Sequence, residues 1–265
     1  MSDVRHDQVR QIVRQQYSRV AESSDACCSS SAPSCCGTSS PEAVSQALGY
    51  SAHETAAVPA GANMGLGCGN PQAIAALKPG ETVLDLGSGG GFDCFLAARQ
   101  VGAAGRVIGV DMTPAMLSKA RANAEQGGFA NVEFRLGEIE HLPVADRSID
   151  VILSNCVINL SPDKPRVFAE CFRVLKPGGR LAISDVVAFA EIPAHIQEDM
   201  ALLTGCMAGA TPIAELGETL HALGFEDVRI APKEESKSFI REWAPGTPIT
   251  DYVVSAAIEA VKPAA

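Results

Sequence analysis

Residues 81–92 read Glu-Thr-Val-Leu-Asp-Leu-Gly-Ser-Gly-Gly-Gly-Phe, and the rest of the chain is organised around this stretch. The short apolar run 83–86 ends in glycines, and a helix-like segment, 93–99, follows at once, which predicts a strand, a tight turn and a helix. Glycine suits such a turn because the backbone must bend sharply and let a ligand lie close against it. The stretch is therefore typical of the first unit of a nucleotide-binding α/β fold.

The glycine spacing departs from the dinucleotide fingerprint, which has glycine at its first, third and sixth positions. Here the glycines are Gly87, Gly89 and Gly91, and the sixth position is a phenylalanine. Asp85 ends the first predicted strand, where it would repel a pyrophosphate and attract a positively charged group. Asp111 ends the second predicted strand, where its carboxylate is suited to bonding both hydroxyls of a ribose.

Together these motifs resemble those of the class I S-adenosylmethionine-dependent methyltransferases. The resemblance implies a Rossmann-like α/β fold with a doubly wound, mostly parallel seven-stranded sheet and an antiparallel C-terminal strand. S-adenosylmethionine would then lie at the carboxyl ends of the strands, with Ile139 packing on its adenine. The residues expected to bind this cofactor are Asp85, Gly87, Ser88, Gly89, Gly91, Asp111, Met112, Glu138, Ile139 and Asn155.

The remaining pattern predicts alternating helices and strands. The expected helices cover residues 4–20, 41–50, 114–127, 162–175, 193–207 and 212–223. The expected further strands cover residues 106–110, 131–136, 148–155, 180–187, 225–230 and 252–260, and residues 58–71 read as a loop. We expect three regions: an N-terminal helix with a mobile Cys/Ser-rich segment (1–55), a cofactor-binding core (56–190) and a sheet-closing region (191–265).

Composition and charge argue against two classes of partner, nucleic acids and membranes. The 265 residues carry a net charge of −10 with no run rich in Lys or Arg, so a nucleic-acid partner is not expected. The N-terminus lacks an apolar signal core, and no stretch reaches the roughly 18 apolar residues of a membrane helix. We therefore expect a cytoplasmic protein without membrane contact. The absence of repeats or a coiled-coil pattern makes a monomer the expected state.

The chain has nine cysteines, and in a reducing cytosol these predict ligation or redox chemistry rather than structural bridges. A low-complexity stretch, 22–41, contains Cys27, Cys28, Cys35 and Cys36, and its composition predicts a mobile segment. The adjacent pairs fit zinc spacing poorly. Exposed thiols without a fixed role and redox exchange with another cysteine both stay open for these four.

Three further cysteines lie in separate loops among small residues. The neighbours of Cys68 and Cys206 predict accessible sulfurs, and Cys156 follows the fourth predicted strand, facing the cofactor crevice. Cys94 and Cys171 lie in predicted helices beside phenylalanines and are expected to pack in the core. No general base is evident near Asn155, whereas soft thiolates select soft, thiophilic centres.

The three cysteine segments, 65–71, 154–160 and 205–209, resemble the signature regions of bacterial arsenite methyltransferases. The resemblance implies that three thiolates hold trivalent arsenic, with Cys156 and Cys206 as persistent ligands and Cys68 as the third. The C-terminal region 191–265 is therefore expected to bind arsenic as well as to close the sheet. It also implies that an upstream cysteine forms a disulfide with Cys68 during turnover and that thioredoxin or glutathione restores the thiols. Cys35 and Cys36 are the nearest candidates for that partner, and Cys27 and Cys28 compete.

Two alternatives stay open on the residues alone. One is a methyltransferase for an organic acceptor such as a quinone or sterol precursor, which would use a base and not need the cysteines. The other is a thiol-based metal or metalloid binding protein without catalysis. The segment 236–245, with Phe239 and Trp243, is either a lid or simple packing. The final methylation state of the arsenic and the acceptance of antimony do not follow from the sequence.

Overall fold

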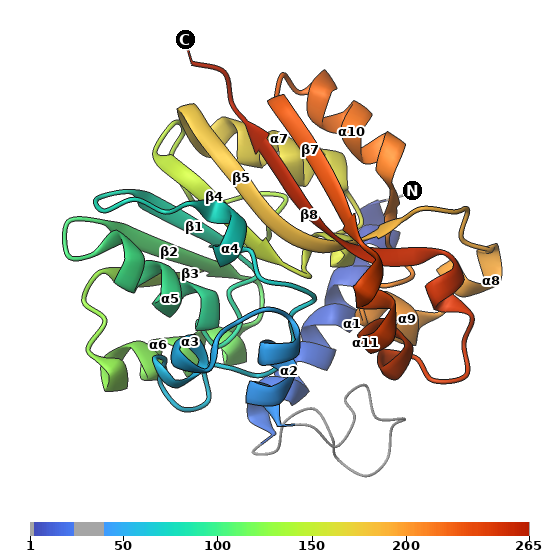
Figure 1. Cartoon of the computed structure of the whole chain (residues 1–265), viewed down its shortest axis with the longest axis horizontal. Coiled ribbons are helices and arrows are strands. Elements are labelled where there is room, and N and C mark those ends of the chain that lie inside the picture. Colours follow the sequence, from blue (N-terminus) through green and yellow to red (C-terminus); the bar gives the residue numbers. More distant parts are fainter. Residues whose placement is uncertain (1–2, 24–39, 265) are drawn as a thin grey trace.

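The computed structural model describes residues 3–23 and 40–264, in which helices and strands alternate (Figure 1). The helices are α1 (Asp3–Glu22), α2 (Pro41–Ala47), α3 (Ala52–Ala56), α4 (Gln72–Ala75), α5 (Phe92–Val101), α6 (Pro114–Gly127), α7 (Lys164–Val174), α8 (Ala194–Gln197), α9 (Met200–Thr204), α10 (Ile213–Ala222) and α11 (Lys237–Trp243). The strands are β1 (Thr82–Leu86), β2 (Arg106–Asp111), β3 (Val132–Leu136), β4 (Ile149–Asn155), β5 (Leu175–Ala188), β6 (Thr211–Pro212), β7 (Glu226–Lys233) and β8 (Val253–Val261). Short 3₁₀ helices are η1 (Ile158–Leu160), η2 (Glu234–Ser236) and η3 (Ile249–Asp251).

Some predictions concern residues that are not described. The mobility expected for 22–41 and the roles of Cys27, Cys28, Cys35 and Cys36 fall outside the described residues, apart from the ends of that segment. Among the described residues, none of the helices is long and apolar enough to cross a membrane. The three-region division stays a prediction.

The sheet has the strand order β3-β2-β1-β4-β5-β8-β7, and the two-residue β6 pairs with β5. Strands β1 to β5 are parallel along this path, and β8 is antiparallel to both β5 and β7. The predicted doubly wound sheet with an antiparallel C-terminal strand is therefore confirmed. Strand order reverses between β1 and β4, and such a switch point is where open α/β sheets bind ligands.

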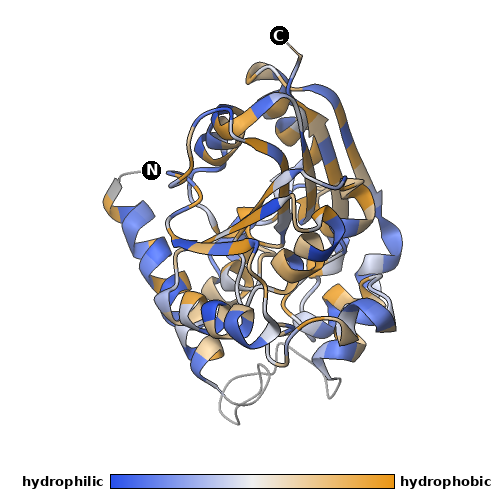
Figure 2. Ribbon diagram, turned by 90° about the vertical axis from the view of Figure 1, so that its left-hand side faces the viewer, coloured by the Kyte–Doolittle hydropathy of each residue, from blue (hydrophilic) through white to orange (hydrophobic). Residues whose placement is uncertain are grey.

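Helices cover both faces of the sheet because its strands are apolar on both sides (Figures 1 and 2). In β1, Val83 packs in a cluster with Phe95 of α5, whereas Leu84 and Leu86 pack in a cluster with Phe168 of α7. This alternation along one strand places α4, α5 and α6 on one face and α7 and α10 on the other. The rigid, buried sheet fixes the loops at its carboxyl edge.

A separate apolar cluster lies beyond that edge and is built from α1, α8, α9, α11 and the neighbouring loops. It includes Cys68, Cys156 and Cys206. Phe239 and Trp243 of α11 pack on this cluster with their ring centroids 5.0 Å apart. The segment 236–245 thus contributes packing to the cysteine region.

The helix expected over 193–207 is wrong, because α8 and α9 are separate. Asp199 lies between them, and its carboxylate accepts hydrogen bonds from the backbone N–H of Ala201 and Leu202. This cap begins a new helix instead of continuing the old one.

Strand β5 begins earlier than expected. Leu175 already pairs with Ile149, and the next paired positions are Val151 and Arg180. Residues 176–179 therefore bulge from the strand, with Gly178 at a φ of 77°. The residues between the expected helix 162–175 and the expected strand 180–187 are thus a bulge within one longer strand.

Candidate active site

The glycine turn after β1 forms one wall of a cavity. Gly87 and Gly89 have φ values of 65° and 50°, a backbone conformation that favours glycine. A Cβ on Gly87 would lie 2.4 Å from Cγ2 of Val157, whereas a Cβ on Gly89 would meet nothing within 4 Å. Gly87 therefore permits close packing and Gly89 faces open space. Gly91 has a packing role, because a Cβ there would lie 2.7 Å from the ring of Phe95.

Most of the predicted cofactor residues line this cavity. Those on its wall are Asp85, Gly87, Ser88, Gly89, Asp111, Met112, Ile139 and Asn155. Gly91 and Glu138 are not on the wall. The carboxylate of Glu138 instead lies 3.2 Å from Arg14 and 3.5 Å from Arg10 of α1, and the neighbouring Glu140 lines the cavity.

Helix α1 also covers the cavity, which sequence reasoning missed. Arg10, Val13 and Tyr17 line it, and the Arg10 guanidinium lies 3.3 Å from the Glu140 carboxylate. The amphipathic pattern predicted the helix. It carried no signal for where the helix docks.

Asp111 supports the glycine turn directly. Its two carboxylate oxygens accept hydrogen bonds from the backbone N–H of Gly89 at 3.0 Å and of Thr113 at 2.8 Å. Thr113 precedes α6 as predicted, but its side chain makes no capping hydrogen bond. Burial raises the pKa of Asp111 above its ordinary value, although the N–H donors oppose this effect.

Asp85 and Asp93 place two further buried carboxyls in the cavity. Burial raises the pKa of Asp85 well above its ordinary value, and the charge of Asp93 raises it further. The Tyr50 hydroxyl donates to Asp93 at 2.8 Å, and Asn155 Nδ2 lies 3.3 Å from the same carboxylate. Tyr50 and Asp93 were missed from the sequence, although an acid in the first helical turn after a glycine-rich loop is a usable signal.

These groups suit a cationic, hydroxyl-bearing ligand. Among the described residues, no Lys or Arg forms an ion pair with Asp85, Asp93 or Asp111. The Ser88 hydroxyl is buried on the cavity wall and has no hydrogen-bond partner within residues 3–23 and 40–264. Buried polar groups of this kind normally have partners, so they fit a ligand that supplies positive charge and hydrogen bonds.

The three loop cysteines meet beside the cavity, but the accessibility predicted for the sulfurs of Cys68 and Cys206 is wrong. Cys68, Cys156 and Cys206 are 1%, 7% and 3% exposed. The small neighbours bring backbones together instead of opening the site: a Cβ on Gly67 would lie 2.6 Å from the Asn155 amide. One on Gly209 would lie 2.3 Å from the carbonyl oxygen of Asn159. Cys94 and Cys171 are fully buried, as predicted.

The thiols interact with one another. Cys206 Sγ donates to the Cys156 carbonyl oxygen at 2.7 Å. Hydrogen bonds with the thiols of Cys206 and Cys68, together with burial, raise the pKa of Cys156 well above its ordinary value. Burial also raises the pKa of Cys68. Of the three, only Cys156 lines the cavity, and its thiol contacts those of the other two.

Two asparagines, one at the end of β4 and one in η1, hold the other cysteine loops. Asn155 Oδ1 accepts from the Cys68 N–H at 3.0 Å, and Asn159 Nδ2 donates to the Cys206 carbonyl at 3.2 Å. One short segment therefore ties all three cysteines together.

Two of the three loop cysteines have a strained backbone. Cys156 and Cys206 have φ values of 58° and 63°, a left-handed conformation that costs a residue with a Cβ about 1–3 kcal/mol. Such strain persists only where surrounding contacts impose it, and it gathers at functional sites.

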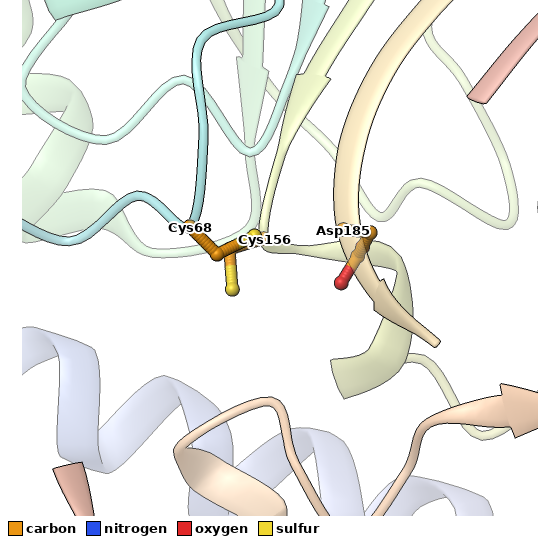
Figure 3. Close-up of side chains that lie close together, drawn as sticks. All are labelled: Cys68, Cys156 and Asp185. Atoms are coloured by element: carbon orange, nitrogen blue, oxygen red, sulfur yellow. The ribbon is translucent and has the colours of Figure 1, made fainter. Parts of the chain in front are cut away.

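Asp185 of β5 lies beside the three loop cysteines, and together Cys68, Cys156, Cys206 and Asp185 form what we call the thiol pocket. Asp185 was not identified from the sequence as part of it. Three possible ligand atoms lie within 4.8 Å of one another: one carboxylate oxygen of Asp185 and the Sγ atoms of Cys68 and Cys156. They come from three neighbouring segments of the chain (Figure 3). Burial raises the pKa of Asp185 to about 6. An acid within an apolar strand was the signal available in the sequence.

We expect the substitution Gly209→Ala to disturb the thiol pocket selectively. The new Cβ would collide with the Asn159 backbone. Because the Asn159 side-chain amide donates three hydrogen bonds that hold this residue in place, the Cys206 loop must move. The free energy of unfolding, measured in urea, should fall by about 1–3 kcal/mol. Gly217→Ala in α10 is the matched control, because its Cβ would meet only one atom, at 3.9 Å. That variant should gain about 0.5–1 kcal/mol, and an equal loss in both variants would contradict the packing argument.

Comparisons with known proteins agree with this geometry. Residues 77–239 match the family model described as a methyltransferase domain. An arsenite methyltransferase of Halobacterium salinarum is 53% identical over 97% of this chain and 68% of its own length. One of Aquipseudomonas alcaligenes is 48% identical over 62% of this chain and 49% of its own length. A crystal structure of CrArsM, an arsenic(III) S-adenosylmethionine methyltransferase from Chlamydomonas reinhardtii, has a TM-score of 0.61, with 34% identity over 85% of this chain and 74% of that one.

The sheet, the glycine turn and the buried acids at the strand ends define a class I methyltransferase whose cofactor is S-adenosylmethionine. Within that class, the chain belongs to the arsenite methyltransferase family.

The buried acids make cofactor binding depend on pH. Because burial raises the pKa values of Asp85 and Asp93, they stabilise the free protein below the unfolded-state pKa of about 3.9, and this stability is lost as pH rises through the folded pKa. A cationic ligand favours the ionised carboxylates. We therefore expect the affinity for S-adenosylmethionine, measured by calorimetry, to rise about tenfold as pH rises through the raised pKa values of these two acids. Adenosine, which carries no positive charge, should change less; an equal change for both ligands would refute the explanation.

Proposed function

We propose that this chain transfers methyl groups from S-adenosylmethionine to trivalent arsenic held by the thiolates of Cys68, Cys156 and Cys206. The observation that carries the proposal is the meeting of three cysteines from separate segments in one buried pocket, with Cys156 on the cofactor cavity wall. The family membership supports the same activity. Methylation of arsenic would serve detoxification.

Arsenic can bind to these thiols without adding net charge to the buried pocket. Arsenite is a neutral hydroxide, and each new As–S bond replaces an As–O bond while the thiol proton leaves with the hydroxyl group as water. The raised pKa values of Cys68 and Cys156 mean that neutral thiols are the resting form, which suits this exchange. Three soft sulfurs then hold the arsenic and leave its lone pair free to act as the nucleophile.

When bound, S-adenosylmethionine supplies an electrophilic methyl group on a sulfonium. The chain's own residues bind and orient the reactants: Asp111 is placed for the ribose hydroxyls, and Asp85 for the positively charged end of the cofactor. Cys156 fixes the arsenic at the boundary between the two pockets, and its burial keeps water away.

Turnover also requires a reductant. Each methyl transfer raises arsenic from the trivalent to the pentavalent state, and oxidation of two thiols to a disulfide returns the two electrons. We infer that Cys68 and an N-terminal cysteine, Cys35 or Cys36, form that disulfide, and that thioredoxin or glutathione reduces it. The N-terminal partner lies outside the described residues, and the monomeric state and cytoplasmic location stay predictions.

The experiment that tests the function is methyl transfer from S-adenosylmethionine carrying a labelled methyl group to arsenite, in the presence of a dithiol. We expect label in methylated arsenicals. If the protein binds the cofactor while arsenic stays unlabelled, the proposal fails and an organic acceptor must be sought.

A further inference from the structure

Asp185 gives the thiol pocket a ligand that trivalent arsenic does not need. Its carboxylate forms a compact buried group with the Sγ atoms of Cys68 and Cys156, all within 4.8 Å of one another (Figure 3). The Sγ of Cys206 is not a member of this group. The pocket therefore contains two overlapping sets of ligands: three sulfurs, and two sulfurs with one carboxylate oxygen.

Hydrogen bonds orient the Asp185 carboxylate. Oδ1 accepts from the Asn159 side chain at 2.9 Å and from the Val186 N–H at 2.8 Å, and Oδ2 accepts from the Ile158 N–H at 2.9 Å. A carboxylate offers about four lone-pair positions, so one remains for a ligand. Ligands fixed by such outer contacts are typical of metal sites.

We propose that Cys68, Cys156 and Asp185 bind a divalent cation of the zinc type at a site that overlaps the arsenic site. Zinc takes cysteine sulfur and aspartate oxygen in a four-coordinate site, and three protein ligands leave one position open. On binding, two metal–sulfur bonds and one metal–oxygen bond replace bonds between the hydrated cation and its water molecules, and the two thiol protons pass to water. Two positive charges enter and two leave, so the net charge of the buried pocket is unchanged.

The two ligands differ in what they require. Trivalent arsenic uses the third sulfur, Cys206, whereas the cation uses the oxygen of Asp185. Both need Cys68 and Cys156, so the cation excludes arsenic from the pocket. The inference rests on the proposed function only in naming arsenic as the competing ligand.

Cobalt(II) is the probe, because its thiolate complexes absorb light and its four-coordinate form has distinctive visible bands. The full-length reduced protein is used with Cys27, Cys28, Cys35 and Cys36 changed to Ser, so that only the described thiols report. We expect Asp185→Asn to weaken cobalt affinity at least about tenfold, the lower end of the loss seen when even an outer contact is removed. Arsenite affinity in that variant should stay within about threefold of the parent.

Cys206→Ser should show the reverse, losing arsenite affinity while keeping the cobalt bands. Cys171→Ser, which removes a buried thiol of α7, is the control and should change neither affinity. Zinc added to the parent should displace cobalt and abolish its bands.

Equal cobalt affinity in the parent and Asp185→Asn would overturn the inference, as would the absence of cobalt binding to fully reduced protein. Because the new amide loses an acceptor for the Ile158 N–H, folding of this variant is checked by circular dichroism. If it is unfolded, Cys68→Ser decides: it must weaken cobalt binding where Cys206→Ser does not. Labelled methyl transfer to arsenite is measured separately, so failure of the cation site leaves the proposed function standing.

Discussion

Replacement of Cys156 by Ser is expected to lower the rate of arsenite methylation by at least about a thousandfold. A hydroxyl oxygen is a hard ligand and does not replace a soft thiolate on arsenic. Cys156 also touches both the other thiols and the cofactor cavity, so no neighbouring sulfur can take its position. The affinity for S-adenosylmethionine should change by less than about threefold, because serine nearly preserves the volume.

The control for this variant is Cys171→Ser. Cys171 is as buried as the pocket cysteines but lies in α7, and burial raises the pKa of its thiol to about 12. Its loss should leave methylation nearly unchanged. Retained turnover in Cys156→Ser, or an equal loss in both variants, would exclude the thiolate mechanism.

Asp111→Ala is expected to weaken S-adenosylmethionine binding by about 10- to 100-fold, as measured by calorimetry. Hydrogen bonds to a charged group contribute about 1.5–3 kcal/mol each, and about 1.4 kcal/mol is a factor of ten in affinity. Asp111 accepts the N–H groups of Gly89 and Thr113 that shape the turn, and we propose that it also binds the ribose.

Asp199→Ala is the matched control. Asp199 also accepts two backbone N–H groups, at 2.8 and 3.2 Å, but it caps α9 and does not line the cofactor cavity. Its loss should leave cofactor affinity unchanged. If Asp111→Ala binds the cofactor as tightly as the unaltered protein, the ribose assignment is wrong.

Local patterns predicted most of the fold. The apolar runs of β1, β2 and β4 and the glycine turn after β1 determine both the strands and the edge where ligands bind, because parallel strands leave all their carboxyl ends on one side. The same reasoning predicted that Asp85 and Asp111 lie at this edge, and both line the cavity. The prediction of one helix over 193–207 is wrong, because the capping hydrogen bonds of Asp199 begin a new helix within a run of helix-forming residues.

The parts of the site that escaped prediction depend on tertiary contacts. Asp185 is the one acid in a mostly apolar strand, and only the sheet register and the left-handed turn at Cys156 bring its carboxylate near the thiols. Tyr50 lies 105 positions before its partner Asn155. Small residues around the cysteines suggested exposure, whereas tight backbone packing at Gly67 and Gly209 buries the sulfurs.

The most direct test of the central claim is X-ray absorption at the arsenic edge, with arsenite bound to the reduced protein and no added thiol. We predict that arsenic has three sulfur neighbours and no oxygen neighbour in the unaltered protein. In the Cys156→Ser variant, sulfur neighbours should be lost. A first shell of oxygens in the unaltered protein, or three sulfurs retained in the variant, would contradict the account.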